Sequence, residues 1–111
     1  MSRMAMSQAA ASLVRALIAR AKCERNRILL TDAQSVDWQS LTFTGERHQI
    51  AFRIIGRDSP HIAERMCAGL EDAEFSIPWL VVADIALVGT PTRGPDGATE
   101  LMIEALTVSE N

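Results

Sequence analysis

Alternating apolar and polar residues in the middle of the chain predict a β-hairpin. Its strands are Val36–Thr44 and Arg47–Ile55, joined at Gly45-Glu46, a two-residue turn that begins with glycine. A turn at this point gives four cross-strand pairs: Phe43–His48, Leu41–Ile50, Gln39–Phe52 and Trp38–Arg53. One side of this hairpin would then face the core, with the residues Leu41, Phe43, His48, Ile50, Phe52 and Ile54.

Apolar residues at helical spacing predict a helix on each side of this hairpin. The first helix begins after Ser7, whose side chain can cap it, and runs to about Arg25. The second begins at Ser59-Pro60, because proline suits the first turn of a helix, and it ends near Asp72.

The remaining segments predict more β-structure. Arg27–Thr31 has an apolar centre and is either a first strand or a continuation of the first helix, and we favour the strand. Asp32–Ser35 is predicted as a turn. Leu80–Gly89 and Thr99–Val108 are rich in β-branched residues and flank a loop of proline and glycine, which predicts a second hairpin.

These elements follow the order α-β-β-β-α-β-β. We therefore expect residues 1–111 to form a single α+β domain, a two-layer sandwich. An antiparallel sheet of four to five strands would carry two helices on one face. The order resembles the layout of small acidic secretion chaperones, which act as dimers, and the resemblance rests on the order of elements alone. It implies a homodimer with a chaperone-like role.

Length and charge narrow the class of protein. The 111 residues are 48% hydrophobic, as expected for a globular domain, and the formal net charge is −3. Residues 1–30 carry a net charge of +5 and residues 31–111 carry −8, so the basic beginning and the acidic remainder should attract each other. The overall acidity disfavours a nucleic-acid partner. A double-stranded-RNA-binding domain also opens α-β-β-β-α, but Ser59–Glu64 lacks the basic cluster that would begin its second helix.

Neither a membrane span nor a secretion signal is predicted. The longest apolar run, Trp79–Val88, contains Asp84 and is far shorter than the roughly 20 residues that a spanning helix needs. Arg15 and Arg20 interrupt the apolar stretch near the start of the chain. We therefore expect a cytoplasmic protein.

The two cysteines give no sign of a metal site. Cys23 and Cys67 stand in no CxxC or Cys/His spacing, so the sequence predicts neither a metal nor a cofactor. Isolated thiols in a cytoplasmic chain are usually reduced. The sequence does not decide whether the two cysteines form a disulfide with each other, because it does not give the distance between them.

Candidate catalytic residues are few. His48 on the core face is a weak candidate for a general base in a pocket between sheet and helices, which would suit small-molecule binding or weak catalysis. Asp84 interrupts an apolar strand, and Glu104 would lie on the neighbouring strand, so the two carboxylates are weak candidates for acid–base chemistry. No nucleophile stands at a spacing that would join them, and whether the protein is an enzyme stays open.

The sheet face away from the helices carries the stronger signal. Its first hairpin is polar, whereas its second hairpin is apolar, and an uncovered apolar half-sheet is typical of a contact surface. The predicted interface residues are Leu80, Val82, Asp84, Ala86, Val88, Met102, Leu106 and Val108. Trp38, stacked on Arg53, is a further candidate anchor for a partner. We expect a non-enzymatic protein-interaction module whose apolar half-sheet is covered by a protein partner, most simply a second copy.

Overall fold

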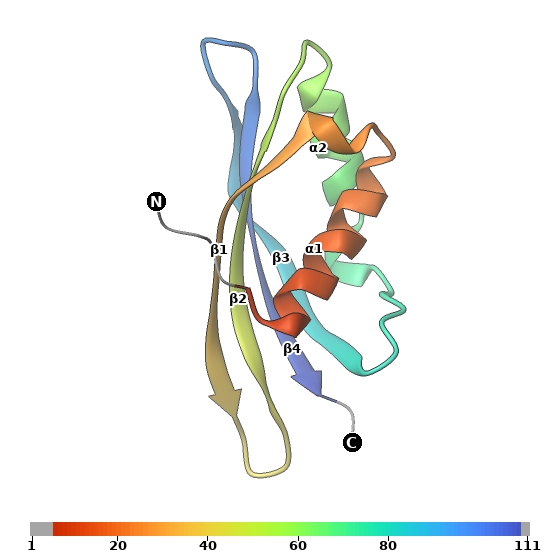
Figure 1. The fold of residues 1–111 in the computed structure, drawn as a ribbon, viewed down its shortest axis with the longest axis vertical. Helices are drawn as coiled ribbons and strands as arrows, with labels where there is room; N and C mark the ends of the chain where they lie inside the picture. Colours follow the sequence, from red (N-terminus) through yellow and green to blue (C-terminus); the bar gives the residue numbers. More distant parts are fainter. Residues whose placement is uncertain (1–5, 110–111) are drawn as a thin grey trace.

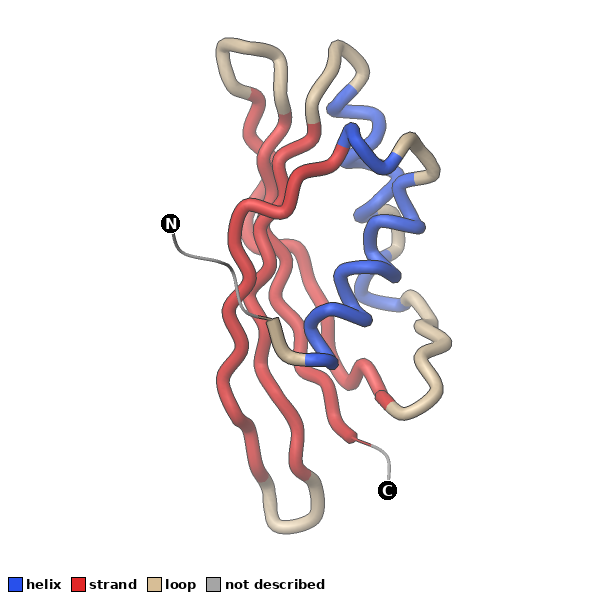
Figure 2. Tube along the Cα trace, viewed as in Figure 1, coloured by secondary structure: helices blue, strands red, loops and turns tan. Residues whose placement is uncertain are grey.

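The fold has two layers, a sheet and a pair of helices (Figures 1 and 2). The structure, a computed structural model, describes residues 6–109. The strands in this range are β1 (Ile28–Gln39), β2 (Thr44–Ile54), β3 (Leu80–Arg93) and β4 (Thr99–Ser109). They form one antiparallel sheet in the spatial order β1-β2-β4-β3. Helices α1 (Gln8–Ala21) and α2 (Ser59–Cys67) cover one of its faces, which confirms the predicted two-layer α+β fold.

The first strand is longer than predicted. β1 runs without a break from Ile28 to Gln39, so the strand interpretation of Arg27–Thr31 is right and the predicted turn at Asp32–Ser35 is wrong. The pairing with β2 shifts by one residue between Leu30 and Asp32. This β-bulge inserts one extra residue and lets the strand continue through the segment that was predicted as a turn. The order of elements in the described chain is therefore α-β-β-α-β-β.

The turn of the first hairpin also lies elsewhere. Leu41 and Thr42 form its tip, and the backbone N–H of Ser40 donates to the carbonyl of Phe43 at 2.9 Å. The Ser40 hydroxyl accepts from the N–H of Phe43 at 3.0 Å, which supplies the turn chemistry that Gly45 was expected to provide. Gly45 lies within β2 instead. The four predicted cross-strand pairs are consequently wrong, and Trp38 faces Gly45 rather than Arg53.

Gly45 is needed for strand pairing. A Cβ atom on this residue would lie 1.9 Å from the carbonyl oxygen of Thr107 on β4. Glycine therefore lets β2 and β4 approach closely at this point, where Gly45 pairs with Val108 on one side and with Trp38 on the other.

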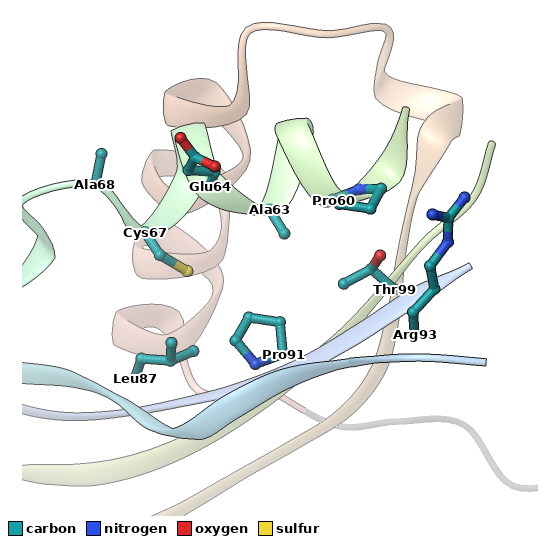
Figure 3. Close-up of a pocket in the computed structure, with 9 residues that line it drawn as sticks. All are labelled: Pro60, Ala63, Glu64, Cys67, Ala68, Leu87, Pro91, Arg93 and Thr99. Carbon is teal, nitrogen blue, oxygen red and sulfur yellow. The ribbon is translucent and has the colours of Figure 1, made fainter. Parts of the chain in front are cut away.

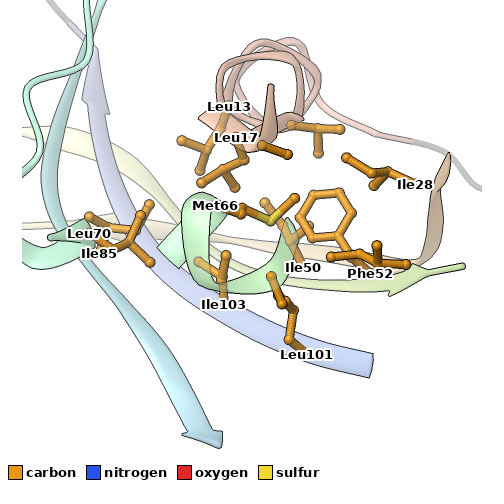
Figure 4. Close-up of a cluster of buried hydrophobic side chains, with 14 of the residues drawn as sticks. Leu13, Leu17, Ile28, Ile50, Phe52, Met66, Leu70, Ile85, Leu101 and Ile103 are labelled. Carbon is orange, nitrogen blue, oxygen red and sulfur yellow. The ribbon is translucent and has the colours of Figure 1, made fainter. Parts of the chain in front are cut away.

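The core lies between the sheet and the helices (Figure 4). The inward residues of β2 are His48, Ile50, Phe52 and Ile54, and all four are buried as predicted. Leu41 and Phe43 were expected among them but are exposed, because the turn lies there. Leu13 and Leu17 of α1 and Met66 of α2 complete the cluster from the helical layer.

The helices begin as predicted, but both end early, α1 at Ala21 and α2 at Cys67 rather than near Asp72. Ser7 caps α1 by accepting from the N–H of Ala10 at 3.1 Å. α1 stops at Ala21 because Lys22 adopts a left-handed conformation with φ of 52°. α2 begins at Ser59, although the Ser59 hydroxyl donates to the carbonyl of Gly97 and bonds the Thr99 hydroxyl instead of capping the helix.

Arginines of the basic first segment bond other parts of the same chain. Arg20 donates to the carbonyls of Met66 and Ala68, which ties α1 to the end of α2. Arg27 forms an ion pair with Asp58 and holds the pKa of that carboxyl below its usual value. Part of the predicted attraction between the basic and acidic segments is thus satisfied within one chain.

Candidate interaction surface

The sheet face opposite α1 and α2, called here the helix-free face, carries many apolar side chains. Alternation along β4 directs Met102, Leu106 and Val108 to this face, where each is half-buried. The facing strand β3 adds Ala86 and Val88. Val36 on β1 is 62% exposed on the same face. The apolar surface of the second hairpin therefore extends onto Val36, while Gln34, Arg47 and Gln49 keep most of the first hairpin's outer face polar, as predicted.

Part of the predicted interface is wrong because β3 contains a β-bulge. The pairing of β3 with β4 shifts between Val82 and Asp84, so the side chains before and after the shift change sides. Leu80 is only 3% exposed and Val82 packs against the core, so both face the helices and not the helix-free face. Val81, which is 45% exposed, takes their place on the outside. The other predicted residues, from Asp84 onward, lie on the helix-free face.

The helix-free face is hollowed near the tip of the first hairpin, at the lower end of Figure 1. The hollow has a volume of about 640 Å³. Its lining is mostly apolar and comes from β1, the hairpin turn, β3 and β4: Trp38, Thr42, Phe43, Val81, Ala83, Leu106, Val108 and Ser109. Gly45 lies between Trp38 and Val108 in the register and has no side chain to fill the space. We call this feature the apolar hollow.

The sequence pattern identified part of this hollow. Trp38, Leu106 and Val108 were candidates, whereas Phe43 was assigned to the core and Val81 was not among the predicted interface residues. The sequence signal that could have revealed the hollow is the apolar pair Leu41 and Phe43 on either side of Thr42. A hairpin turn normally carries polar residues or glycine, so apolar residues there are unusual. At the hairpin tip, Leu41 is 108% exposed.

The predicted anchor pair is separated. Trp38 lines the apolar hollow, but Arg53 lies near the opposite end of β2, between Leu29 and Glu100 in the register. Arg53 forms an ion pair with Asp96 and a second one, of 3.5 Å, with Glu100. Stacking of Arg53 on Trp38 is therefore wrong.

His48 is sealed within the fold. The structure gives its ring two hydrogen bonds of 2.7 Å, from Nδ1 to the Ser35 hydroxyl and from Nε2 to the Thr107 hydroxyl. The side chain is 1% exposed. Burial lowers the pKa of His48, and the negative charge of Glu46 opposes this only in part. A neutral imidazole has one donor and one acceptor, and the two hydroxyls satisfy both.

A cavity beside His48 opens on the other side of the sheet. This hollow of about 320 Å³ is lined by residues of the helix-free face, among them Gln34, Gln49 and Glu104, and it also touches the buried residues His48 and Ala105. His48 shares the opposite face with buried Ile50. The geometry gives the imidazole no open pocket between sheet and helices, which is what a general base would require.

The candidate carboxylates lie on the exposed surface. Asp84 pairs with Leu106, and Glu104 pairs with Ala86 and Gln49, so the two carboxylates are diagonal neighbours on β3 and β4. Diagonal positions in a sheet are about 7–8 Å apart. Both side chains are exposed. Asp84 stands beside the apolar hollow, because its partner Leu106 lines it.

A second groove lies between α2 and β3 (Figure 3). It has a volume of about 410 Å³ and an apolar lining that includes Ala63, Cys67, Leu87 and Pro91. Burial raises the pKa of the Cys67 thiol. Cys67 and Cys23 are both free thiols and both half-buried.

The fold and surface define a small two-layer α+β protein whose sheet carries an apolar patch on its helix-free face. No protein-family model matches the chain, and no curated protein matches it. None of the helices within residues 6–109 is long and apolar enough to cross a membrane. In the same range, no three His, Cys, Asp or Glu side chains are grouped as they would be around a metal ion.

Proposed function

We propose that this chain is a non-enzymatic, homodimeric protein-interaction module with a chaperone-like role in the cytoplasm. Its helix-free face is the surface that holds another polypeptide. The observation that carries this proposal is the apolar hollow, in which Trp38, Phe43 and Leu106 line a concave surface that is open to solvent. Contiguous apolar surface on one face of a domain is typical of an interaction site.

The shape of the hollow indicates what fills it. A face-to-face second copy would set one concave hollow against another and leave a void between them, although packing in interfaces is normally dense. A segment of another protein with protruding apolar side chains fills the space instead. Each leucine- or phenylalanine-sized side chain that it buries contributes about 1.5–3 kcal/mol.

Charge at the rim favours a particular kind of segment. Asp84 is exposed beside the hollow, opposite Leu106. A basic residue next to the apolar side chains of the partner would meet this carboxylate. Rim charges of this kind mainly raise the association rate and set the orientation of the partner.

An aggregation assay tests the proposal. Reduced insulin exposes apolar segments and aggregates, and the wild-type protein should suppress the light scattering of that aggregation. Val81→Glu and Leu106→Glu place a charge in the apolar hollow and should abolish the suppression. Val88→Glu is the matched control, because Val88 is exposed on the same strand and face but lies outside the hollow. Aggregation that proceeds unchanged in the presence of the wild-type protein would count against a chaperone-like role.

Tryptophan fluorescence reports on the hollow itself. The chain has two tryptophans, so Trp79→Phe leaves Trp38 as the single emitter. Filling the hollow with a client segment removes water from Trp38 and should shift its emission to shorter wavelength. The shift should be absent when Leu106→Glu is added to the Trp79→Phe background.

A further inference from the structure

The two edges of the sheet are protected to very different degrees. On β3 the pairing is irregular between Val82 and Asp84 and again between Val88 and Thr92, and Pro91 lies within the second irregular stretch. Bulges and proline are the usual devices that stop an edge strand from pairing with another chain. On β1 the register shifts once, between Leu30 and Asp32, and the pairing is regular over the whole of 32–39, a segment with neither proline nor glycine.

The register shows which backbone groups of β1 point outward. The Ser40 N–H donates to the Phe43 carbonyl, which makes this a hydrogen-bonded pair. Such pairs alternate along an antiparallel ladder, so Trp38, Val36 and Gln34 also bond toward β2. The N–H and C=O groups of the intervening residues point away from β2 along the free edge of the sheet: Ala33, Ser35, Asp37 and Gln39.

We propose that β1 of one copy pairs with β1 of a second copy, antiparallel across a two-fold axis at Val36, so that two sheets become one. This rests on the homodimeric part of the proposed function and names the surface that forms the dimer. The register centred on Val36 uses every outward group: Ser35 pairs with Asp37 of the second copy, and Ala33 pairs with Gln39. Each of these pairs contributes two hydrogen bonds.

Charge selects this register over its neighbours. A two-fold axis at Asp37 would set the two Asp37 carboxylates directly opposite each other, which is destabilising. An axis at Ser35 would set Gln39 opposite Thr31, which lies in the bulge outside the regular part of the strand. With the axis at Val36, Asp37 faces Ser35, and the two exposed Val36 side chains pack against each other on the helix-free face.

The proposed dimer leaves the apolar hollow of each copy open to another polypeptide. A two-fold axis perpendicular to the sheet places the helices of both copies on one side and both helix-free faces on the other. Trp38 belongs to β1 and also lines the apolar hollow, so the new edge contact continues into it. One joined sheet would therefore offer two apolar hollows to a client.

Proline substitution tests the edge. Asp37→Pro removes an N–H that points outward and should leave the bonds to β2 intact. Sedimentation at 1–100 µM protein measures the dimer dissociation constant. We expect the constant of Asp37→Pro to be about tenfold or more above that of wild type. Asp37→Ala is the matched control, because it removes the charge but keeps the N–H, and it should remain dimeric. Circular dichroism verifies that both variants are folded.

Cysteine cross-linking tests the register without disturbing the backbone. In the proposed ladder the two Val36 residues form a non-hydrogen-bonded pair, with Cα atoms about 4.5 Å apart, within the range for a disulfide. Val36→Cys, with Cys23 and Cys67 replaced by alanine, should give a covalent dimer on mild oxidation. Gln34→Cys in the same background should not, because its two copies would lie about four residue steps apart, well over 7 Å.

The outcomes separate this inference from the proposed function. The proposed β1–β1 dimer is supported if Val36→Cys but not Gln34→Cys gives a covalent dimer and if Asp37→Pro dissociates the dimer. A dimer that survives Asp37→Pro and is lost in Leu106→Glu overturns the edge but keeps the homodimer, through the helix-free face. A strict monomer at every concentration overturns both the edge and the homodimeric part of the proposed function.

Discussion

Removing His48 should destabilise the fold by a predictable amount. The imidazole is fully buried and bridges the hydroxyls of Ser35 and Thr107. His48→Ala leaves the buried Thr107 hydroxyl without its partner, which costs about 1–3 kcal/mol. The missing ring also leaves a cavity in the packed interior, so we expect the free energy of unfolding to fall by about 2–4 kcal/mol in total.

The same burial makes stability depend on pH. In the unfolded chain His48 has a pKa of 6.5, and burial lowers the pKa in the folded state. Below pH 6.5 the unfolded state therefore takes up a proton that the folded state does not. The contribution of His48 to the free energy of unfolding is fully present above pH 6.5. It falls as pH drops below that value, by at most about 1.4 kcal/mol per pH unit, and levels off below the lowered pKa.

Urea denaturation of wild type and His48→Gln between pH 8 and pH 5 measures this effect. Glutamine has both a donor and an acceptor for the two hydroxyls but does not titrate. The free energy of unfolding of wild type should decline more steeply below pH 6.5 than that of His48→Gln. His61→Gln is the control, because His61 is exposed in the first turn of α2 and its variant should follow wild type.

Two results would refute this account of His48. One is an identical pH dependence for wild type and His48→Gln, since the folded-state pKa would then be unperturbed. The other is rapid acylation of His48 by diethyl pyrocarbonate in the folded protein, which would mean that the ring is open to solvent. We expect the reagent to label His61 and to spare His48.

Three further substitutions have expected effects on stability, each measured by urea denaturation. Ser7→Ala removes the cap of α1 and should cost about 1 kcal/mol, whereas Ser7→Asp should retain most of the stability. Gly45→Ala forces a Cβ against the Thr107 carbonyl and should cost more than Gly69→Ala, where the new Cβ meets open space and the cost is only the roughly 1–2 kcal/mol of a left-handed backbone; equal costs would contradict the close approach of β2 and β4. Arg53→Ala removes ion pairs at the protein surface and should change stability by less than about 1 kcal/mol, an effect that shrinks further in high salt.

Strand parity could be predicted from the sequence even where strand pairing could not. The alternation His48, Ile50, Phe52 belongs to β2 alone, so its inward direction does not depend on the partner strand. The predicted pairing of the two strands was wrong because the sequence holds two competing turn signals. Gly45-Glu46 matches a common hairpin turn, while the side-chain bonds of Ser40 that close the real turn leave only a weak trace in the sequence.

The β-bulges are the second reason why the sequence did not predict every side chain's face correctly. One extra residue near Leu30 and another near Val82 reverse the faces of the residues on one side of each shift. Alternation counted along β3 therefore placed Leu80 and Val82 on the helix-free face, while the residues from Asp84 onward were assigned correctly. Period-two patterning carries no signal for an inserted residue, so only the pairing with β4 fixes its position.

The residues that misled the turn prediction are also those that make the surface unusual. Leu41 at the hairpin tip gains nothing from folding, because it stays fully exposed, and Phe43 beside it is still 54% exposed. Isolated exposed apolar residues are ordinary on any protein and would be scattered over the surface. Here Val36, Leu41, Phe43 and Val81 are the most exposed large apolar residues of the described chain, and the strand register places all four at the hairpin turn or within four residue positions of Ser40. This concentration at one end, where the apolar hollow meets the free edge of β1, supports one continuous contact region there and not general surface hydrophobicity.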